Sequence, residues 1–121
     1  MAKRILVIED HEENRRIMHD LLTHGGYEML EAHTGEDGVA AAARERPDLI
    51  LMDIQLPGID GCETTRRIKA DPALRGIPII AVTSYALSGD DQKAMAAGCD
   101  AYVTKPFSPR ALLAKIREHL G

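Results

Sequence analysis

The sequence is poor in the features that mark several common classes of protein. Aromatic side chains make up 3% of its 121 residues, and its formal net charge at pH 7 is −4. A nucleic-acid-binding surface normally shows a basic excess and basic runs interleaved with aromatic residues, and the chain has neither. No apolar stretch approaches the roughly 18 residues that cross a membrane as a helix. We therefore expect neither nucleic acid nor a membrane as a partner.

Cysteine and histidine are too few or too scattered to suggest a cross-linked or zinc-bound fold. Cys62 and Cys99 are far apart and form no CxxC pair, so neither a disulfide framework nor a zinc site is expected. Residues 1–4 lead directly into an apolar run and not into a signal peptide, which favours a cytoplasmic protein. The five histidines share no ligand spacing, and we expect all of them to be solvated: His11, His19, His24, His33 and His119.

What the sequence does contain is a regular alternation of short apolar runs and amphipathic segments. Five runs are too short for helices and predict strands: 4–9, 28–32, 48–53, 79–83 and 101–104. Helices are predicted in the segments that follow these strands: 12–24, 34–46, 61–70, 88–97 and 109–120. This (βα)5 order predicts an α/β fold in which helices cover both faces of one open parallel sheet. The length predicts a single domain, 1–121.

Two of the predicted helices have a recognisable apolar face. In the helix that Thr34 opens, Asp37 is placed to complete a capping box. The small side chains of this helix suggest close packing on the sheet through Val39, Ala40 and Ala43. In the helix 12–24, the predicted buried face consists of Ile17, Met18, Leu21 and Leu22.

Four of the predicted strands stop at polar side chains. Glu9 and Asp10 stand at the end of the first strand, Asp53 ends the third, Thr83 ends the fourth, and Lys105 follows the fifth. In an open parallel sheet the carboxyl ends of the strands share one edge, where ligands bind. Two carboxylates about 4 Å apart repel by about 4 kcal/mol at an effective dielectric constant near 20, so the cluster must take up protons or bind a cation. Oxygen ligands with no histidine or cysteine nearby favour a hard ion such as Mg²⁺.

A carboxylate in such a pocket can itself be a nucleophile that forms an aspartyl phosphate. Asp53 is the best candidate because it ends the most apolar strand, near the middle of the sheet. Lys105 would pair with the phosphate as a point charge, and the Thr83 hydroxyl would donate to one of its oxygens. Each residue alone is explained as well by a turn, a solvated side chain or a strand position. Their occurrence together at matching strand ends is the informative pattern.

These residues carry a resemblance to a known family. The chain resembles a bacterial two-component response-regulator receiver domain, of the stand-alone chemotaxis-regulator kind, over essentially its whole length. The resemblance lies in Glu9-Asp10, the stretch 48–61, Thr83-Ser84 and Lys105-Pro106. It implies a flavodoxin-like three-layer sandwich with strand order 2-1-3-4-5. It also implies that Asp53 receives a phosphoryl group from a phosphohistidine of a sensor histidine kinase or a histidine phosphotransfer protein.

The resemblance also implies which atoms would bind the metal. Mg²⁺ would be bound by Asp10, Asp53 and the backbone carbonyl of Gln55, with Glu9 joining through water. The Lys105–Pro106 peptide bond would be cis.

The resemblance also implies how the domain would signal. Tyr102 would be a switch aromatic that turns inward as Thr83 moves toward the phosphate; the alternative is a half-buried aromatic on an edge strand. The face formed by the fourth helix, fifth strand and fifth helix would then bind a downstream protein. Catalysis would be limited to phosphorylation and dephosphorylation of the domain itself, so the chain would be a switch and not an enzyme.

Several alternatives stay open at this point. An aspartate-nucleophile phosphatase would carry a second Asp two residues after the first, where this chain has Gln55. A receiver excised from a hybrid histidine kinase would share the same site, although the initiating Met and the compact end favour a complete protein without an output domain. A pseudo-receiver would bind partners without phosphate. We expect a monomer or a weak homodimer paired through the last helices.

Overall fold

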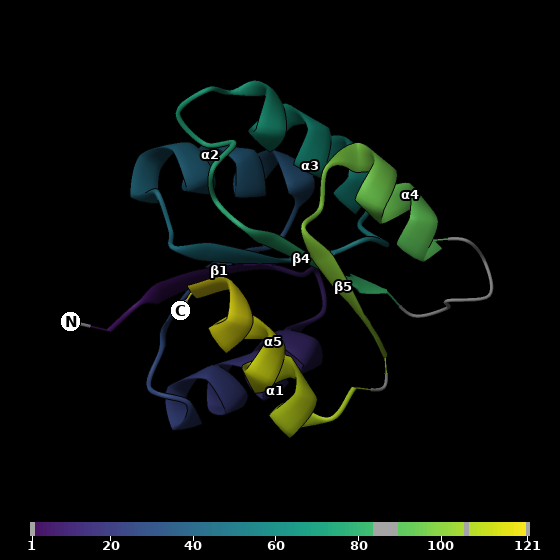
Figure 1. The fold of residues 1–121 in the computed structure, drawn as a ribbon. Coiled ribbons are helices and arrows are strands. Elements are labelled where there is room, and N and C mark those ends of the chain that lie inside the picture. Colours follow the sequence, from purple (N-terminus) through teal and green to yellow (C-terminus); the bar gives the residue numbers. More distant parts are fainter. Residues whose placement is uncertain (1, 84–89, 106, 121) are drawn as a thin grey trace.

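Within residues 2–83, 90–105 and 107–120, which the computed structural model describes, five strands alternate with five helices (Figure 1). The strands are β1 (Arg4–Ile8), β2 (Glu28–Ala32), β3 (Leu49–Asp53), β4 (Ile79–Thr83) and β5 (Ala101–Thr104). The helices are α1 (Glu12–His24), α2 (Gly35–Glu45), α3 (Gly61–Ala70), α4 (Asp90–Ala97) and α5 (Pro109–Leu120).

The strands form one parallel sheet in the order β2-β1-β3-β4-β5. This arrangement confirms the predicted flavodoxin-like α/β fold and its strand order. The predicted strand ends are off by one residue in two places, because β1 ends at Ile8 and β3 begins at Leu49. The predicted start of the fourth helix at Ser88 and the predicted cis bond at Pro106 lie outside the described residues.

Two apolar clusters, one on each face of the sheet, are formed by side chains of the strands and of the helices that cover them. Figure 1 shows α2, α3 and α4 on one face of the sheet, and α1 and α5 on the other. Successive residues of β1 alternate between the two clusters: Ile5 and Val7 pack with α1 and α5, and Leu6 and Ile8 pack with the other layer. Because both faces are covered, the central strands are apolar at consecutive positions and not only at alternate ones.

The predicted face of α1 includes one residue that does not belong to it. Met18, Leu21 and Leu22 are buried, as expected. Ile17, however, is 55% exposed. Neighbouring positions in a helix are about 100° apart, so Ile17 lies beside the buried stripe and not within it.

The predicted face of α2 is right at Val39, which packs against the core, but wrong at its two alanines. The buried positions of α2 include Gly38, Ala41 and Ala42, whereas Ala40 and Ala43 are exposed. A Cβ atom at Gly38 would lie 2.5 Å from Cδ1 of Ile8, so this helix approaches β1 more closely than a side chain would allow. The Oγ atom of Thr34 accepts a hydrogen bond from the Asp37 amide at 3.1 Å, which confirms the predicted cap.

The start of α3 lies directly against the end of β3. Asp60 caps this helix by accepting a hydrogen bond from the Glu63 amide at 2.8 Å. A Cβ atom at Gly61 would lie 2.3 Å from the backbone oxygen of Asp53, so only glycine allows the two backbones to approach this closely. The Gly61 amide donates to the carbonyl of Ile54 at 3.0 Å. These contacts fix the backbone on which the Asp53 side chain stands.

Lys69 and Asp100 link α3 to the segments before β4 and β5. The Lys69 ammonium donates to Oδ2 of Asp100 at 3.1 Å and to the carbonyls of Arg75 and Ile77, both at 3.0 Å. The same Oδ2 accepts from the Ile79 amide at 2.8 Å. We call this set of contacts the Lys69–Asp100 clasp.

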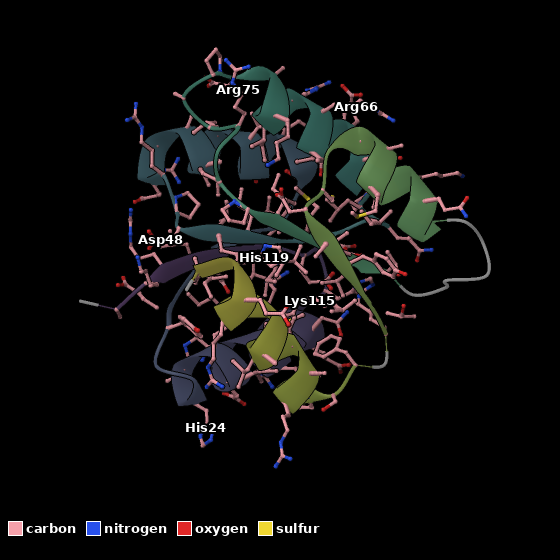
Figure 2. All side chains as sticks on the ribbon, viewed as in Figure 1. His24, Asp48, Arg66, Arg75, Lys115 and His119 are labelled. Atoms are coloured by element: carbon pink, nitrogen blue, oxygen red, sulfur yellow. The ribbon has the colours of Figure 1, made fainter. Side chains whose placement is uncertain are left out.

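Polar side chains cover the outer faces of the helices. In Figure 2, His24 at the end of α1 and Arg66 on α3 project away from the sheet. Four of the five histidines are exposed, and His119 is half-buried. Among the described residues, no helix combines the length and apolar character required to cross a membrane.

Candidate functional site

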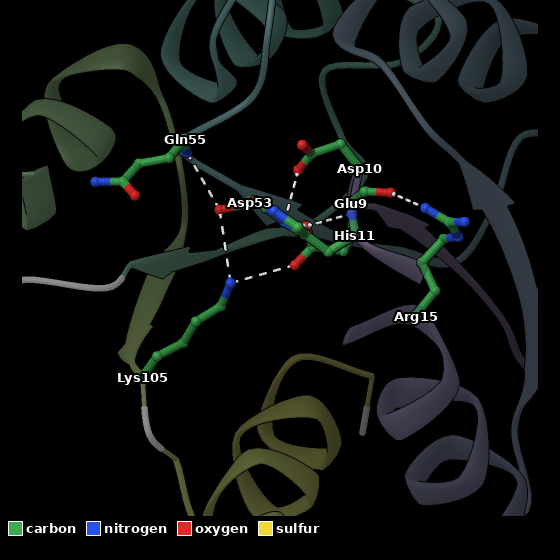
Figure 3. Close-up of polar contacts among 7 residues, drawn as sticks. All are labelled: Glu9, Asp10, His11, Arg15, Asp53, Gln55 and Lys105. Atoms are coloured by element: carbon green, nitrogen blue, oxygen red, sulfur yellow. Dashed lines mark hydrogen bonds and ion pairs between the residues drawn. The ribbon is translucent and has the colours of Figure 1, made fainter. Parts of the chain in front are cut away.

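Acidic side chains from two neighbouring strands meet at one edge of the sheet (Figure 3). Each of Glu9, Asp10, His11 and Asp53 offers a ligand atom, and these atoms all lie within 4.8 Å of one another. Glu9 is only 3% exposed and Asp53 only 5%. The structure therefore brings the three predicted acids together, although α1, β2 and α2 separate β1 from β3 in the sequence.

The strand register explains this meeting. Ile8 is paired with Met52, so Glu9 and Asp53 follow at adjacent positions beyond the last paired residues. The Glu9 amide donates to the carbonyl of Ala32 at 3.0 Å, which carries the pairing one step past β1. Arg15 on α1 donates to the Glu9 carbonyl at 3.0 Å and so ties the first helix to the same turn.

Lys105 follows the carboxyl end of β5, and its side chain extends to the acids. Thr83 is paired with Thr104, and the Lys105 amide donates to the Thr83 carbonyl at 2.6 Å. The Lys105 ammonium lies 3.2 Å from Oε1 of Glu9 and 3.9 Å from Oδ1 of Asp53. One cation therefore faces two buried carboxylates.

This imbalance of charge shifts the pKa values of both buried acids. Burial, followed by the hydrogen bond with Glu9 and its charge, raises the pKa of Asp53 to about 7. Burial would also raise the pKa of Glu9, but the hydrogen bond with Asp53 and the charge of Lys105 lower it to about 2. Lys105 lies closer to Glu9 than to Asp53, so its charge favours the ionised form of Glu9 more strongly than that of Asp53.

Two buried oxygens in this region make no hydrogen bond with any described residue. They are Oδ1 of Asp10 and Oγ1 of Thr83. A buried polar atom without a partner costs about 1–3 kcal/mol, so both oxygens would gain from a bound ligand. A hard divalent ion would satisfy the carboxylate oxygen, and an anion would satisfy the hydroxyl. The donor set therefore fits Mg²⁺ next to a phosphoryl group.

The prediction that no histidine lies near the acids is wrong. Nδ1 of His11 is 3.2 Å from Oδ1 of Asp10 and 3.5 Å from Oε2 of Glu9, although not in hydrogen-bonding geometry. The ring is 68% exposed, in agreement with the expectation that the histidines are solvated. The signal was present in the sequence, because His11 directly follows the acid pair in the turn that leaves β1.

The two remaining predicted residues are Gln55, which lies beside the acids, and Tyr102, which lies on β5. The Gln55 amide donates to Oδ1 of Asp53 at 3.2 Å, so the backbone just after β3 contacts the acceptor candidate. Tyr102 is 39% exposed on β5. It lines a groove of about 590 Å³ on the face formed by α4, β5 and α5, together with Met95, Phe107, Ala111 and Lys115.

Comparison with known proteins gives a consistent assignment. Residues 5–117 match the family model described as the response regulator receiver domain. The chain is 42% identical to the polar-differentiation response regulator DivK of Brucella anthropi and 41% identical to that of Brucella ovis. In each case the match covers all of this chain and 98% of the relative.

Solved structures show the same similarity. The receiver domain of the sensor histidine kinase PA1611 from Pseudomonas aeruginosa, solved with a magnesium ion coordinated in its active-site cleft, is 36% identical, with a TM-score of 0.95. That match covers 100% of this chain and 99% of the solved chain. A CheY-like receiver domain protein from Methanospirillum hungatei is 37% identical, with a TM-score of 0.88 over 99% of this chain and 94% of the other.

These findings reject the phosphatase alternative, because the match extends over nearly the whole chain and the related proteins are regulators. The chain therefore belongs to the response regulator receiver domain family, and it is a phospho-accepting switch of two-component signalling, not an enzyme.

Proposed function

We propose that Asp53 accepts the phosphoryl group, and that the donor is a phosphohistidine of a sensor histidine kinase or a histidine phosphotransfer protein. The observation that carries this proposal is the position of the Asp53 carboxylate. It is buried at the end of a central strand, beside Glu9 and within 3.9 Å of the Lys105 ammonium. In the reaction a carboxylate oxygen of Asp53 forms a bond to phosphorus, the phosphorus–nitrogen bond breaks, and its electron pair returns to the imidazole of the donor.

The metal in this proposal is Mg²⁺, held by Asp10, Asp53 and the backbone carbonyl of Gln55, with Glu9 joining through water. Oδ1 of Asp10, which is buried and accepts no hydrogen bond from the described residues, supports this assignment, as does the magnesium ion in the related PA1611 receiver domain. When bound, Mg²⁺ would supply positive charge that offsets the repulsion between the acids and the incoming phosphoryl oxygens.

Lys105 and Thr83 would bind the transferred group. Lys105 is engaged with Glu9 in the unphosphorylated structure, so it must give up part of that ion pair in order to contact the phosphate. Thr83 is fully buried and its hydroxyl is unpaired among the described residues, which leaves this group available to donate to a phosphate oxygen. Aspartyl phosphate adds strong acceptor oxygens that attract both groups.

The output in this proposal is a change in protein binding. Thr83 ends β4 and Tyr102 lies on the adjacent β5, where it lines the groove beside α4 and α5. Movement of Thr83 toward the phosphate would leave room for the exposed Tyr102 ring to turn inward and would reshape this groove. A downstream protein that prefers one shape shifts the population by its differential affinity. We place the switch in the cytoplasm, as a monomer or weak homodimer.

Phosphorylation by a small donor tests the acceptor assignment. The chain is incubated with acetyl phosphate and Mg²⁺, and incorporated phosphate is measured by intact mass for the wild type, Asp53→Asn and Asp20→Asn. Asp20 is an exposed acid on α1 and serves as the control. We expect one phosphoryl group per chain in the wild type and in Asp20→Asn, none in Asp53→Asn, and none after removal of Mg²⁺ with a chelator. Equal labelling of Asp53→Asn and the wild type would overturn the assignment.

A receiver domain of a hybrid histidine kinase remains a second candidate context for the same chemistry. The observation in its favour is the similarity to the PA1611 receiver domain, which is part of a sensor histidine kinase. The phosphorylation experiment gives the same result in either context. Phosphotransfer profiling against purified kinases and phosphotransfer proteins, with rates compared among donors, would identify the partner.

A further inference from the structure

A histidine ring lies at the mouth of the acidic cluster, and the chemistry proposed so far makes no use of it. Figure 3 shows the His11 ring beside Glu9, Asp10 and Asp53, with a dashed line joining it to the Asp10 carboxylate. Nδ1 of His11 is 3.2 Å from Oδ1 of Asp10 and 3.5 Å from Oε2 of Glu9. It also belongs to the group of four ligand atoms that lie within 4.8 Å of one another.

These distances are those expected between neighbouring ligands of one metal ion. For metal–ligand bonds of about 2.1 Å, adjacent ligand atoms lie about 3.0 Å apart in an octahedron and about 3.4 Å apart in a tetrahedron. The two distances from Nδ1 fall close to these values. The Oδ1 atom of Asp10 that faces the ring is the buried oxygen without a hydrogen-bond partner in the described part of the chain.

The backbone holds His11 in this position. Its amide donates to Oε2 of Glu9 at 3.3 Å, and Arg15 fixes the Glu9 carbonyl at 3.0 Å. Both contacts involve Glu9, and they hold the turn that carries His11. The ring is 68% exposed, and Nδ1 is the ring atom that lies near the carboxylates.

We propose that His11 is a metal ligand at this site, and that its imidazole gives the site a higher affinity for borderline divalent transition ions, such as Ni²⁺, Co²⁺ and Zn²⁺, than for Mg²⁺. Imidazole nitrogen is a favourable ligand for these ions, whereas Mg²⁺ prefers oxygen and keeps much of its water. The inference rests on the proposed metal site and extends it to a mixed nitrogen and oxygen donor set. A transition ion bound through His11 would compete with Mg²⁺ for the same carboxylates.

Calorimetric titration of the untagged full chain with Ni²⁺ and with Mg²⁺ tests the proposal. The variants are His11→Asn, His11→Ala and His19→Asn, at one fixed pH. His19 is an exposed histidine on α1 with a carboxylate 3.7 Å away, so it is a matched control for adventitious binding. We expect both His11 variants to lose at least about tenfold in Ni²⁺ affinity, and to lose much less in Mg²⁺ affinity. His19→Asn should behave as the wild type does.

A spectroscopic measurement tests whether the ion binds beside the ring, whereas the affinity of the His11 variants tests ligation itself. Paramagnetic Ni²⁺ at a substoichiometric level should broaden the His11 ring resonances before those of the other histidines. Equal Ni²⁺ affinity in the wild type and both His11 variants, or His11 resonances that stay sharp, would overturn the proposal and leave His11 as an ion-pair partner only. The proposed function fails separately, if Asp53→Asn is still phosphorylated by acetyl phosphate.

Discussion

The ammonium of Lys105 lies closer to Glu9 than to Asp53, at 3.2 Å from Oε1 of the former and 3.9 Å from Oδ1 of the latter. The lysine thus stabilises the ionised form of Glu9 more than that of Asp53, and burial beside Glu9 raises the pKa of Asp53 to about 7. A single ammonium therefore faces two buried carboxylates.

Removing the charge of Asp53 should stabilise the metal-free protein. The pKa of Asp53 is raised to about 7 in the folded state, so the folded chain keeps a proton that the unfolded chain loses near pH 4. Stability therefore falls as the pH rises from about 4 to 7, and the loss persists above that range. We expect Asp53→Asn to raise the free energy of unfolding by on the order of 2 kcal/mol at pH 8, and much less at pH 4.

Urea unfolding of the wild type and Asp53→Asn across this pH range, with a chelator present, measures the difference. Asp20→Asn, which changes an exposed acid, is the control. A gain in stability that is as large at pH 4 as at pH 8 would contradict the assigned protonation of Asp53.

Replacement of Lys105 by methionine should slow phosphorylation by acetyl phosphate. The variant keeps most of the side-chain volume but removes the ammonium that faces both acids. Developing negative charge on the phosphoryl oxygens then lacks a partner, and we expect the rate to fall at least about tenfold. Lys93→Met, at an exposed position on α4, is the matched control. Rates are measured by quenched intact-mass analysis at saturating Mg²⁺, and an unchanged rate would remove Lys105 from the proposed machinery.

Alanine at position 61 should disturb the acceptor strand. Its Cβ atom would lie 2.3 Å from the backbone oxygen of Asp53, so either α3 or the end of β3 must shift. We expect a loss of about 2 kcal/mol in stability and a slower phosphorylation of Asp53. Gly76→Ala is the control, because it makes the same substitution at a position where a Cβ atom would have no neighbour within 4 Å. Thermal unfolding and acetyl phosphate labelling of the two variants should therefore diverge, and equal behaviour would show that the backbone approach is not as close as described.

The Lys69–Asp100 clasp should contribute to stability without contributing to the chemistry of the site. Asp100→Ala removes an acceptor that Lys69 and the Ile79 amide share, and leaves a half-buried amide without its partner. We expect a loss of about 1–2 kcal/mol in the free energy of unfolding, and an acetyl phosphate labelling rate equal to that of the wild type. Asp20→Ala is the surface control. A large change in the labelling rate would indicate that the clasp reaches the phosphorylation site.

The fold was predictable because strands covered on both faces must be apolar at consecutive positions, and β1, β3 and β4 are. The buried face of α2 was not predictable in the same way. Glycine and alanine differ little in hydrophobicity, so the sequence could not distinguish Gly38 and Ala41 from Ala40 and Ala43. Packing decided the outcome, because a Cβ atom at position 38 would lie 2.5 Å from Cδ1 of Ile8.

The sheet topology predicted that the acids lie close together, but it did not predict which side chains contact each acid. Parallel strand ends share an edge, which brings Glu9 and Asp10 close to Asp53. Lys105 and Glu9 are 96 residues apart in the sequence. Which of the two acids the lysine contacts depends on the conformations of these side chains, and no local sequence pattern specifies them. The approach of the His11 ring depends on the turn that its own amide makes with Glu9.

The enclosure of β1, β3 and β4 between two helical layers separates chemistry from recognition. Substitutions in these strands would disrupt the hydrophobic interior, whereas the outward faces of the helices can change with little effect on the acids. Signalling routes could therefore multiply by gene duplication, with each copy acquiring a new docking specificity while its reactive centre stays the same.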